Sequence, residues 1–456
     1  MCGCGEEGRM STDASAAPSK AAAAAVAKKT APAPAPAPAP AKAPAPAAAA
    51  KAAPKAAPKA PAPAPAPAKA KAGPAGSAAK APAPPEPEPE PAAPTSGPGT
   101  PKTFQVNRNS VFKQYLLGAG WRAAEPHERA QLAHWDAHTK NGPANAEINC
   151  FPRAATNCID NIWTYFKRVE AIGMANDGFP ETFFEWRELD KATIESSPIW
   201  FLKQVWGVHG NGINLVGSWE DYQKAVKDTP KKATFVNGPS GKREDIADSY
   251  YLQRGLCNCH LYEGRKYLLR VYYLALGDGS VCVYDDALGY AHGTPFDAGE
   301  KTWRVHVSHV NVPGKDEGHT DDRIYFTLSE QPFGAEVMAK IMEHSKRHLP
   351  ILQETITVSQ GHAKPENRVD ASRYHMWGVD YLVGDDDGKL SVWCIELNAF
   401  PNMNHNNPRK GGKKQQNEID FRAAGFDRDM MRKIGLEKQD ATKNKWVEVL
   451  PAFAKK

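Results

Sequence analysis

The first hundred residues limit what this chain can fold into. From about residue 16 to residue 100 the sequence is alanine, proline and lysine in short near-repeats such as APAPAPAPAPAKAPAP, and it ends on PPEPEPEP. Branched aliphatic and aromatic side chains are almost absent, so this stretch cannot bury enough apolar surface to offset the entropy of ordering. Frequent proline favours extended polyproline conformations. We therefore expect a disordered, semi-stiff arm over residues 1–102.

The arm also carries the excess charge of the chain. Residues 1–100 contain eleven Lys and Arg against six Asp and Glu, and this balance of +5 equals the net charge of all 456 residues. The remainder is neutral overall. Two interpretations of the arm stay open: it contacts an acidic surface such as a tubulin tail or a nucleic acid, or it is a solvated spacer.

The cellular setting follows from what the sequence lacks. No apolar run approaches the roughly 18–20 residues of a membrane span, and no signal-peptide core follows MCGCGEEGRM. Cys2 and Cys4 are weak candidates for palmitoylation. The eight cysteines include no CxxC pair. We expect a reduced, cytoplasmic protein.

About 350 residues remain for a folded part, and its elements alternate irregularly. Strands and helices mix without strict βαβ order, which predicts an α+β domain over 103–440, followed by a C-terminal tail over 441–456. Helical periodicity is expected around VFKQYLLGAGW and ERAQLAHW, and in 218–226, 332–349 and 419–436. Residues 148–172 are expected to form a loop followed by an amphipathic helix. Strands are expected in ETFFEW, IWFLKQV, INLV and DSYYLQRGL, in 265–276, 280–287 and 304–312, and in a hairpin from Trp377 to Pro401.

A glycine-rich turn follows the predicted strand IWFLKQV. Gly207, Gly210 and Gly212 lack the Gly-Lys-Ser/Thr ending of a P-loop, and a strand rather than a helix comes next. Such a turn can cover a nucleotide, because glycines let backbone amides approach phosphate oxygens, and Lys203 would add a positive charge. On spacing alone an ordinary hairpin turn is the favoured interpretation.

The hairpin after Trp377 carries oxygen ligands. Glu396 and Asn398 are two residues apart in VWCIELN and so project from one strand face, while Asp380 lies in the partner strand across the GDDDG turn. Two carboxylates and an amide on one face suit Mg²⁺. The alternative is the solvated face of an edge hairpin.

Two cations lie on one face of another predicted strand. Lys266 and Arg270 are four residues apart in RKYLLRVYYLAL, within an otherwise apolar run. Phosphates or a substrate carboxylate would be suitable partners. Surface charge on an edge strand is the alternative.

These motifs occur in a familiar order. The series WFLKQVWGVHGNGI, YLQRGL, YEGRKYLLRVYYL, VHVSHVN and WGVDYL…WCIELNAFP resembles the tubulin tyrosine ligase-like family of ATP-grasp enzymes. QYLLGAGWR and INCFPRAATNCIDNIWTYFKR are similar to upstream segments of that family. The resemblance covers about residues 105–440. It implies an ATP-grasp fold, with three interlocked α/β subdomains and the nucleotide between two sheets.

The resemblance also implies roles for individual residues. The implied catalytic residues are Arg270, Lys266 and Glu396, with Arg270 facing the γ-phosphate or the substrate carboxylate. The implied ligands of one or two Mg²⁺ ions are Asp380, Glu396 and Asn398. The implied ATP-binding residues comprise two lysines, the glycine-rich cover, an adenine hinge and a residue of the VHVSHVN motif: Lys203, Lys266, Gly207, Gly210, Gly212, Gln253, Arg254, Leu256 and Ser308.

The implied chemistry is ATP-dependent amide ligation. A protein carboxylate attacks the γ-phosphate to give an acylphosphate, and the amine of a free amino acid (Glu, Gly or Tyr) displaces phosphate. Tubulin is the first expected acceptor, with the cytoskeleton or the cilium as expected locations. Two alternatives stay open: a catalytically weak microtubule-binding protein, and an ATP-grasp ligase with another acceptor.

Some positions depart from the family pattern. Leu268 stands where an Asp is expected, and Tyr290 where an acceptor-binding Arg is expected. Ser308 and His309 replace a Thr-Asn pair. We infer that ATP and Mg²⁺ binding are retained and that the acceptor side has drifted.

Overall fold

The computed structural model describes residues 102–106, 111–134, 146–156, 159, 162–174, 178–207, 212–238, 240–307, 323–399, 401, 420–440 and 442–454. The predictions on the arm, Cys2, Cys4, Gly210 and Ser308 lie outside these residues. The chain divides into two compact units, Met1–Glu88 and Pro89–Lys456, and all described residues belong to the second.

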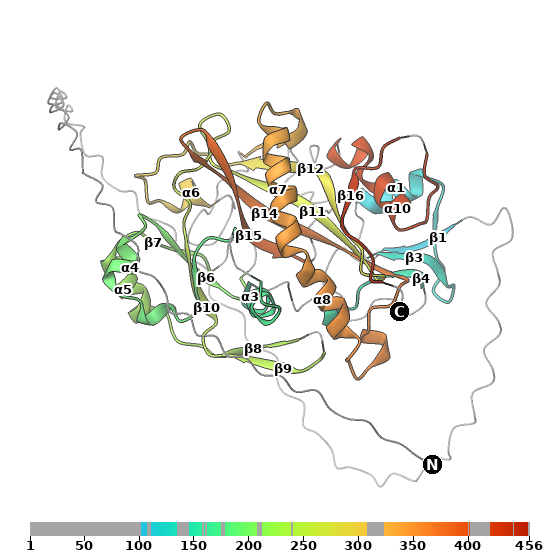
Figure 1. Ribbon diagram of the computed structural model, residues 1–456, viewed down its shortest axis with the longest axis horizontal. Coiled ribbons are helices and arrows are strands. Elements are labelled where there is room, and N and C mark those ends of the chain that lie inside the picture. The colour runs from blue at the N-terminus through green and yellow to red at the C-terminus, as the bar shows by residue number, and fades with distance from the viewer. Residues whose placement is uncertain are drawn as a thin grey trace, which may run out of the picture. The chain divides into compact units, whose positions relative to one another are not determined.

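Ten strands of the described residues form one mixed sheet, which contains the long central strands of Figure 1. The order is β13-β12-β11-β14-β4-β3-β1-β2, with β15 paired to β14 and β16 to β12. Strands β1 to β4 run parallel to one another, whereas β11 to β16 are joined by antiparallel pairs. The bounds are β1 Thr103–Val106, β2 Arg122–Ala123, β3 Ala130–His134, β4 Ala146–Cys150, β11 Tyr267–Leu276, β12 Val281–Ala291, β13 Ile324–Thr327, β14 Arg373–Asp386, β15 Lys389–Asn398 and β16 Trp446–Leu450.

The β14–β15 hairpin confirms the prediction made from its sequence. Its turn consists of Asp387 and Gly388, both with positive φ (54° and 84°), as a two-residue turn that matches the twist of the strands requires. The Asp385 carboxylate accepts a hydrogen bond from the Gly388 amide at 2.6 Å. Of the three acidic residues of the GDDDG segment, Asp387 lies in the turn, whereas Asp385 and Asp386 end strand β14.

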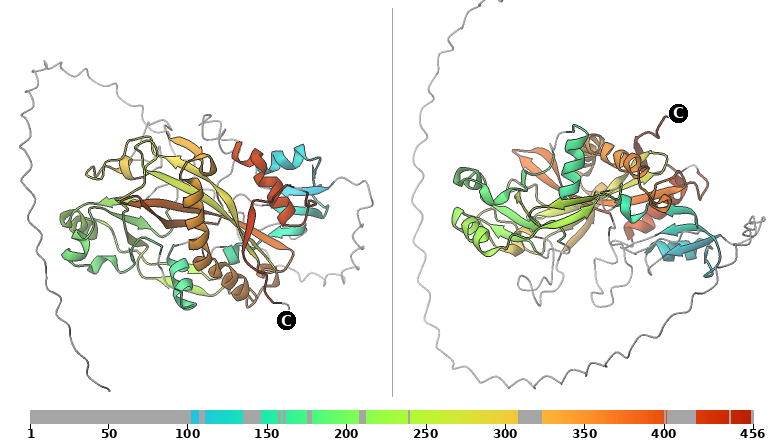
Figure 2. Two further views of the ribbon diagram at one scale, coloured as in Figure 1. Left: turned by 45° about the horizontal axis from the view of Figure 1, so that its top comes forward. Right: turned by 90° about the horizontal axis from the view of Figure 1, so that it is seen from below.

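Alternating residues of the central strands build two cores, one on each face of the sheet. On one face Leu269, Val271 and Tyr273 pack with the helices α3, α7 and α8, and Figures 1 and 2 show α7 and α8 crossing this face. On the other face Tyr272 and Leu274 pack with α1 and α10. The bounds of these helices are α1 Val111–Gly118, α3 Ile162–Ala171, α7 Gly334–His348, α8 Pro350–Ser359 and α10 Asp427–Lys433; the short α2 spans Arg153–Thr156.

A second, four-stranded antiparallel sheet has the order β5-β10-β6-β7, and its outer face packs on α4 and α5 around Trp200 and Leu252. Ser218 caps the N-terminus of α5, because its hydroxyl accepts a hydrogen bond from the Asp221 amide at 3.0 Å. The bounds are β5 Thr182–Phe183, β6 Trp200–Gln204, β7 Asn214–Val216, β10 Tyr250–Arg254, α4 Lys191–Glu195 and α5 Trp219–Asp228; β8 Thr234–Asn237 and β9 Arg243–Ile246 pair separately.

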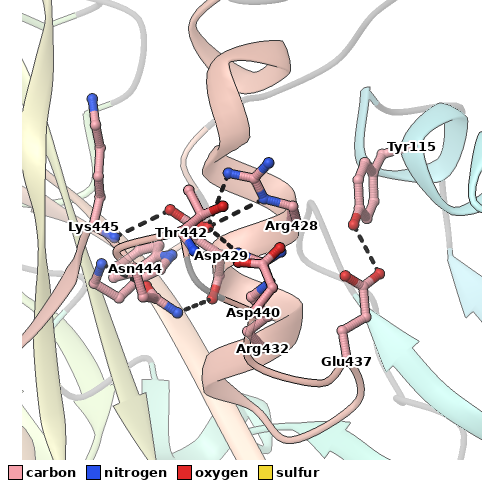
Figure 3. Close-up of polar contacts among 10 residues, drawn as sticks. Tyr115, Arg428, Asp429, Arg432, Glu437, Asp440, Thr442, Asn444 and Lys445 are labelled. Atoms are coloured by element: carbon pink, nitrogen blue, oxygen red, sulfur yellow. Dashed lines mark hydrogen bonds and ion pairs between the residues drawn. The ribbon is translucent and has the colours of Figure 1, made fainter.

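Polar contacts hold the segment after α10 against α10 itself and against α1, as Figure 3 shows. The Asp429 carboxylate accepts from the Lys445 amide at 3.1 Å, and the Asn444 side chain donates to the Asp429 carbonyl at 2.9 Å. The Tyr115 hydroxyl of α1 donates to Glu437 at 2.8 Å. These contacts fix the segment that leads from α10 into β16.

Three expectations were wrong. The segment ERAQLAHW contains strand β3, not a helix, because it pairs in parallel with β1 and β4. A strand was expected over 304–312, but residues 304–306 belong to the short helix α6, Trp303–His306, and the His306 ring donates to the Glu300 carbonyl at 2.6 Å. Residues 308–312 of that prediction lie outside the described residues. The expected C-terminal tail supplies β16 to the main sheet. None of the helices in the described part is long and apolar enough to cross a membrane.

Candidate active site between the two sheets

The large sheet places three charged side chains in one row. In the strand registers Arg270 of β11 faces Asp380 of β14, and Asp380 faces Glu396 of β15. Arg270 and Asp380 form a bidentate ion pair, in which Nε and Nη2 of Arg270 donate to the two carboxylate oxygens. The distance from Nη2 to Oδ2 is 2.9 Å. Only 17% and 7% of these side chains is exposed, whereas Glu396 is exposed. The row thus ends in a carboxylate that solvent or a ligand can reach.

The charge of Arg270 is fixed by its surroundings. Burial lowers its pKa, but the charge of the Asp380 carboxylate, the Tyr290 phenol and the hydrogen bonds that Arg270 donates to Asp380 outweigh burial and raise the pKa well above its ordinary value. The Asn398 amide nitrogen also donates to Asp380, at 3.4 Å. Asp380 therefore orients both the guanidinium and the amide.

The smaller sheet turns a second set of side chains toward this row. Lys203 and Tyr251 are register partners, as are Phe201 and Gln253, and all four alternate with the residues that pack on α4 and α5. Lys203 Nζ donates to Gln253 Oε1 at 2.7 Å, and Gln253 in turn donates to the Thr182 hydroxyl at 3.1 Å. The predicted hinge residue Gln253 thereby orients a predicted phosphate-binding lysine.

Charges of the large sheet act on side chains of the smaller sheet. Burial lowers the pKa of Lys203 to about 8; Glu396 and Asp380 act in the opposite direction, and Lys266 lowers the pKa further. Burial, with the Glu396 charge, raises the pKa of Tyr251. A lysine with such a perturbed pKa, between a second lysine and two carboxylates, is a feature of functional sites rather than of solvated surfaces.

Lys266 lies at the junction of the two sheets and is 2% exposed. Its ammonium donates to the Leu256 carbonyl at 3.2 Å and lies 5.8 Å from the ring centroids of Phe201 and Phe296. A buried ammonium with one carbonyl partner has further donors for an anion. Leu256, one of the three residues predicted as the adenine hinge with Gln253 and Arg254, thus contacts Lys266 through its backbone carbonyl.

One predicted residue, Arg254, differs from the rest in its placement. The Arg254 side chain points away from the row, since its guanidinium donates to Glu181 at 3.0 Å and to the Ser196 hydroxyl at 2.7 Å. Its backbone amide is also used, by the Glu181 carbonyl. The Arg254 side chain therefore links β10 to the end of α4.

The glycine-rich turn joins β6 to β7, and its two ends are described. Gly207 donates to the Gln204 carbonyl at 3.0 Å. Gly212 has a φ of +77°, a backbone conformation that favours glycine. The strand–turn–strand form predicted from the sequence is confirmed.

Two of the departures from the family pattern are neighbours in the structure. Leu268 and Tyr290 are direct register partners on β11 and β12, on the same face as Arg270. Opposite charges at these two positions would lie side by side. In this chain an apolar pair, Leu268 and Tyr290, takes their place. The sequence alone gave no reason to link them.

Phe201 and Tyr251 face the site but were not predicted. The signal was available, because both alternate with the core residues Trp200, Leu202 and Leu252 in strands of period two. Phe296 and His306 could not be found in this way. They lie outside the strands, and their rings meet near Lys266, 5.7 Å apart.

The oxygen donors in the row fit a hard divalent cation in their chemistry. Asp380, Glu396 and Asn398 supply two carboxylates and, since the Asn398 nitrogen is used on Asp380, an amide oxygen. In the described residues no cluster of three or more His, Cys, Asp or Glu side chains is placed to hold a metal. A metal at this site would therefore need Asn398, or a second molecule, to complete its ligands.

Comparison with known proteins agrees with this geometry. The model of the tubulin-tyrosine ligase family matches residues 138–412, more than half of the chain and all of the site residues described above. No curated protein matches the chain. A mixed sheet, with a smaller sheet facing it across lysines and carboxylates, fits an ATP-grasp-like fold of this family. The chain belongs to the tubulin-tyrosine ligase family.

Proposed function

We propose that this protein is an ATP- and Mg²⁺-dependent carboxylate-amine ligase, which joins a free amino acid to a protein carboxylate, with tubulin as the first acceptor to test. The observation that carries the proposal is the convergence of Lys203 and Lys266 with the Arg270–Asp380–Glu396 row between two sheets. ATP would bind in this space, with the ends of the glycine-rich turn, Gly207 and Gly212, on its covering side.

Each cation has a distinct part in the proposed reaction. Lys203 and Lys266 would contact phosphate oxygens and offset the negative charge that builds up at the transferring group. Ligand binding would draw Lys203 from Gln253, its present partner at 2.7 Å. Arg270 uses Nε and Nη2 on Asp380, so Nη1 is the nitrogen left to hold a substrate carboxylate or the γ-phosphate.

Asp380, Glu396 and Asn398 would hold Mg²⁺, which supplies charge neutralisation and alignment of the phosphates. In the reaction the acceptor carboxylate attacks the γ-phosphorus and ADP leaves, and the amine of the amino acid then attacks the acyl carbon and phosphate leaves. The chain itself supplies no nucleophile. It has to position the reactants, exclude water and stabilise charge.

The test is direct transfer of a labelled amino acid. The full chain is incubated with ATP, Mg²⁺, labelled Glu, Gly or Tyr, and either tubulin or a cell lysate as acceptor, and the labelled position is located by mass spectrometry. Lys203→Ala and Glu396→Gln should reduce labelling at least 100-fold. Lys224→Ala and Glu220→Gln, on the exposed side of α5, are the matched controls and should leave it unchanged.

The outcomes separate the hypotheses. Transfer to tubulin supports the full proposal, and transfer only to another protein in the lysate keeps the ligase but changes the acceptor. If no amino acid is transferred to any protein while the chain still binds microtubules, and Glu396→Gln does not alter that binding, the ligase proposal fails in favour of a binding protein.

A further inference from the structure

Two partly buried cysteines, Cys257 and Cys259, follow the predicted adenine hinge in the chain. The other three cysteines that the structure describes are buried. The proposed reaction uses neither of the two thiols. Within the described part of the chain, these are therefore the thiols that a small reagent can reach.

The Cys259 thiol and the Lys266 ammonium share one acceptor. Cys259 Sγ donates to the Leu256 carbonyl at 3.1 Å, and Lys266 Nζ donates to the same oxygen at 3.2 Å. Leu256 belongs to the predicted hinge, and Lys266 is the lysine proposed to contact phosphate. A change at the Cys259 sulfur therefore affects the hinge and the lysine together.

The two thiols lie on the same side of a short extended segment. Cys259 forms an antiparallel bridge with Gly384 of β14. Asn258 is exposed and its side chain donates to Asp386, so Cys257 and Cys259 point to the opposite side. Residues two apart in an extended chain have Cα atoms about 6.6 Å apart, which lies within the range of roughly 4.4–6.8 Å that disulfides span.

We propose that Cys257 and Cys259 form a thiol switch, which a peroxide closes to a disulfide and which then lowers the affinity of the site for nucleotide. This inference goes beyond the ligase chemistry. It rests on the proposed function only in taking ATP as the ligand of the site.

The oxidation balances with a peroxide as the oxidant. The Cys259 thiolate attacks a peroxide oxygen, so that an S–O bond forms and the O–O bond breaks; the hydroxide that leaves takes up the thiol proton and becomes water. The Cys257 thiolate then attacks the sulfenic sulfur, an S–S bond forms, the S–O bond breaks, and a second water leaves in the same way. Two thiols lose two electrons in total, and one hydrogen peroxide is reduced to two water molecules.

Lys266 favours the reactive thiolate form of both cysteines. Burial has the largest effect and raises the pKa of Cys257 and of Cys259, while the Lys266 charge lowers the pKa of each. A hydrogen bond from Lys266 lowers the pKa of Cys259 further, and for this reason we assign the first attack to Cys259. A phosphate bound to Lys266 would neutralise its charge, so bound nucleotide should slow the oxidation.

Disulfide formation changes the contacts of the hinge. The Cys259 sulfur loses the hydrogen that it donates to the Leu256 carbonyl and turns toward Cys257. Lys266 is only 2% exposed, so its ammonium has little room to follow a displaced carbonyl. We expect the ammonium to lose the alignment that phosphate binding needs.

The test compares the reduced and the oxidised full chain. The protein is treated with hydrogen peroxide at pH 8 and desalted, and its affinity for Mg²⁺ with a non-hydrolysable ATP analogue is measured by calorimetry at pH 7. Oxidation should weaken binding about tenfold or more, and a thiol reductant should restore it. The tryptic peptide 255–265, which contains both cysteines, should become lighter by two hydrogen atoms. A peptide without this loss, or a disulfide that leaves the affinity unchanged, would overturn the inference.

Substitutions identify the thiols that respond. Cys259→Ser should bind the analogue equally before and after peroxide, within about twofold, and a persistent peroxide effect in this variant would overturn the assignment. Cys257→Ser should form no disulfide and should leave a sulfenic acid at Cys259 that dimedone captures. The matched control is Cys2→Ser with Cys4→Ser, which removes the other cysteine pair of the same spacing and should leave the full response to peroxide.

The switch and the proposed function fail in different ways. If the reduced chain binds the ATP analogue and peroxide does not weaken the binding, the switch is overturned and the nucleotide site stands. If the reduced chain binds no nucleotide, the proposed function is refuted and the switch with it, whatever the state of the two thiols.

Discussion

Two arginine–aspartate pairs in this molecule have similar geometry and different surroundings. Arg422 and Asp427 are five residues apart, in and beside the π-helical turn Arg422–Phe426, with contacts of 2.9 and 3.0 Å and side chains only 1% and 2% exposed. Arg270 and Asp380 are 110 residues apart and meet across two strands, with 17% and 7% exposed. The first pair is local; the second depends on the sheet.

The difference lies in what surrounds each pair. The Arg422 guanidinium lies 5.5 Å from the ring centroid of Phe426 and 5.9 Å from that of Phe112, within the core that joins α1 to the C-terminal helix. The Arg270–Asp380 pair lies in a field that also contains Lys203, Lys266 and Glu396. An ion pair inside an apolar core can only stabilise or specify the fold. An ion pair that lies beside further charges of both signs can also respond to a bound ligand.

Removing one partner of the core pair should have the largest effect. Asp427→Asn leaves the Arg422 charge buried, and we expect a loss of about 3–5 kcal/mol in the free energy of unfolding. Denaturant titration measures this loss. Nucleotide affinity per folded molecule should stay within about twofold, and a larger change would show that the two pairs are not independent.

Arg270→Lys should affect chemistry more than stability. The charge remains, but a lysine cannot make the two-pronged contact with Asp380. We expect amino acid transfer to fall about 100-fold, equivalent to about 2.7 kcal/mol, while the melting temperature moves little. A large drop in melting temperature with normal transfer would show that Arg270, like Arg422, serves the fold rather than the reaction.

Nucleotide affinity should depend on pH through Lys203. Its pKa of about 8 means that the ammonium is largely charged at pH 7 and largely neutral at pH 9, so the affinity for an ATP analogue should fall about tenfold over that interval. Calorimetry at each pH measures it. Lys203→Arg stays charged throughout and is the control; a fall of the same size in that variant would exclude Lys203 as the cause.

The smallest effect should come from a site that is local and exposed. Ser218→Ala removes the side-chain oxygen that accepts from the Asp221 amide, and we expect a loss of about 1 kcal/mol in the free energy of unfolding. Transfer activity should be unchanged. A change in transfer would mean that α5 contributes to the site through the smaller sheet.

Features controlled by nearby residues were predictable from the sequence. The cap at Ser218, the helix over 332–349, the Asp-Gly turn of the β14–β15 hairpin and the shared face of Glu396 and Asn398 all follow from spacing of a few residues. ERAQLAHW was not predictable in the same way. Its short apolar pattern suits a helix or a strand, and only the pairing of β3 with β1 and β4 decides.

By itself the sequence determined the residue types of the site and their order along the chain, which was enough to indicate the family. Only the tertiary structure decided which of them meet. It joins Arg270 to Asp380 instead of leaving it free, turns the side chain of Arg254 away and makes Leu268, Tyr290 and Tyr325 into one row. The physical reason is that strand register sets these contacts, and register is fixed by the packing of both sheet faces over more than a hundred residues.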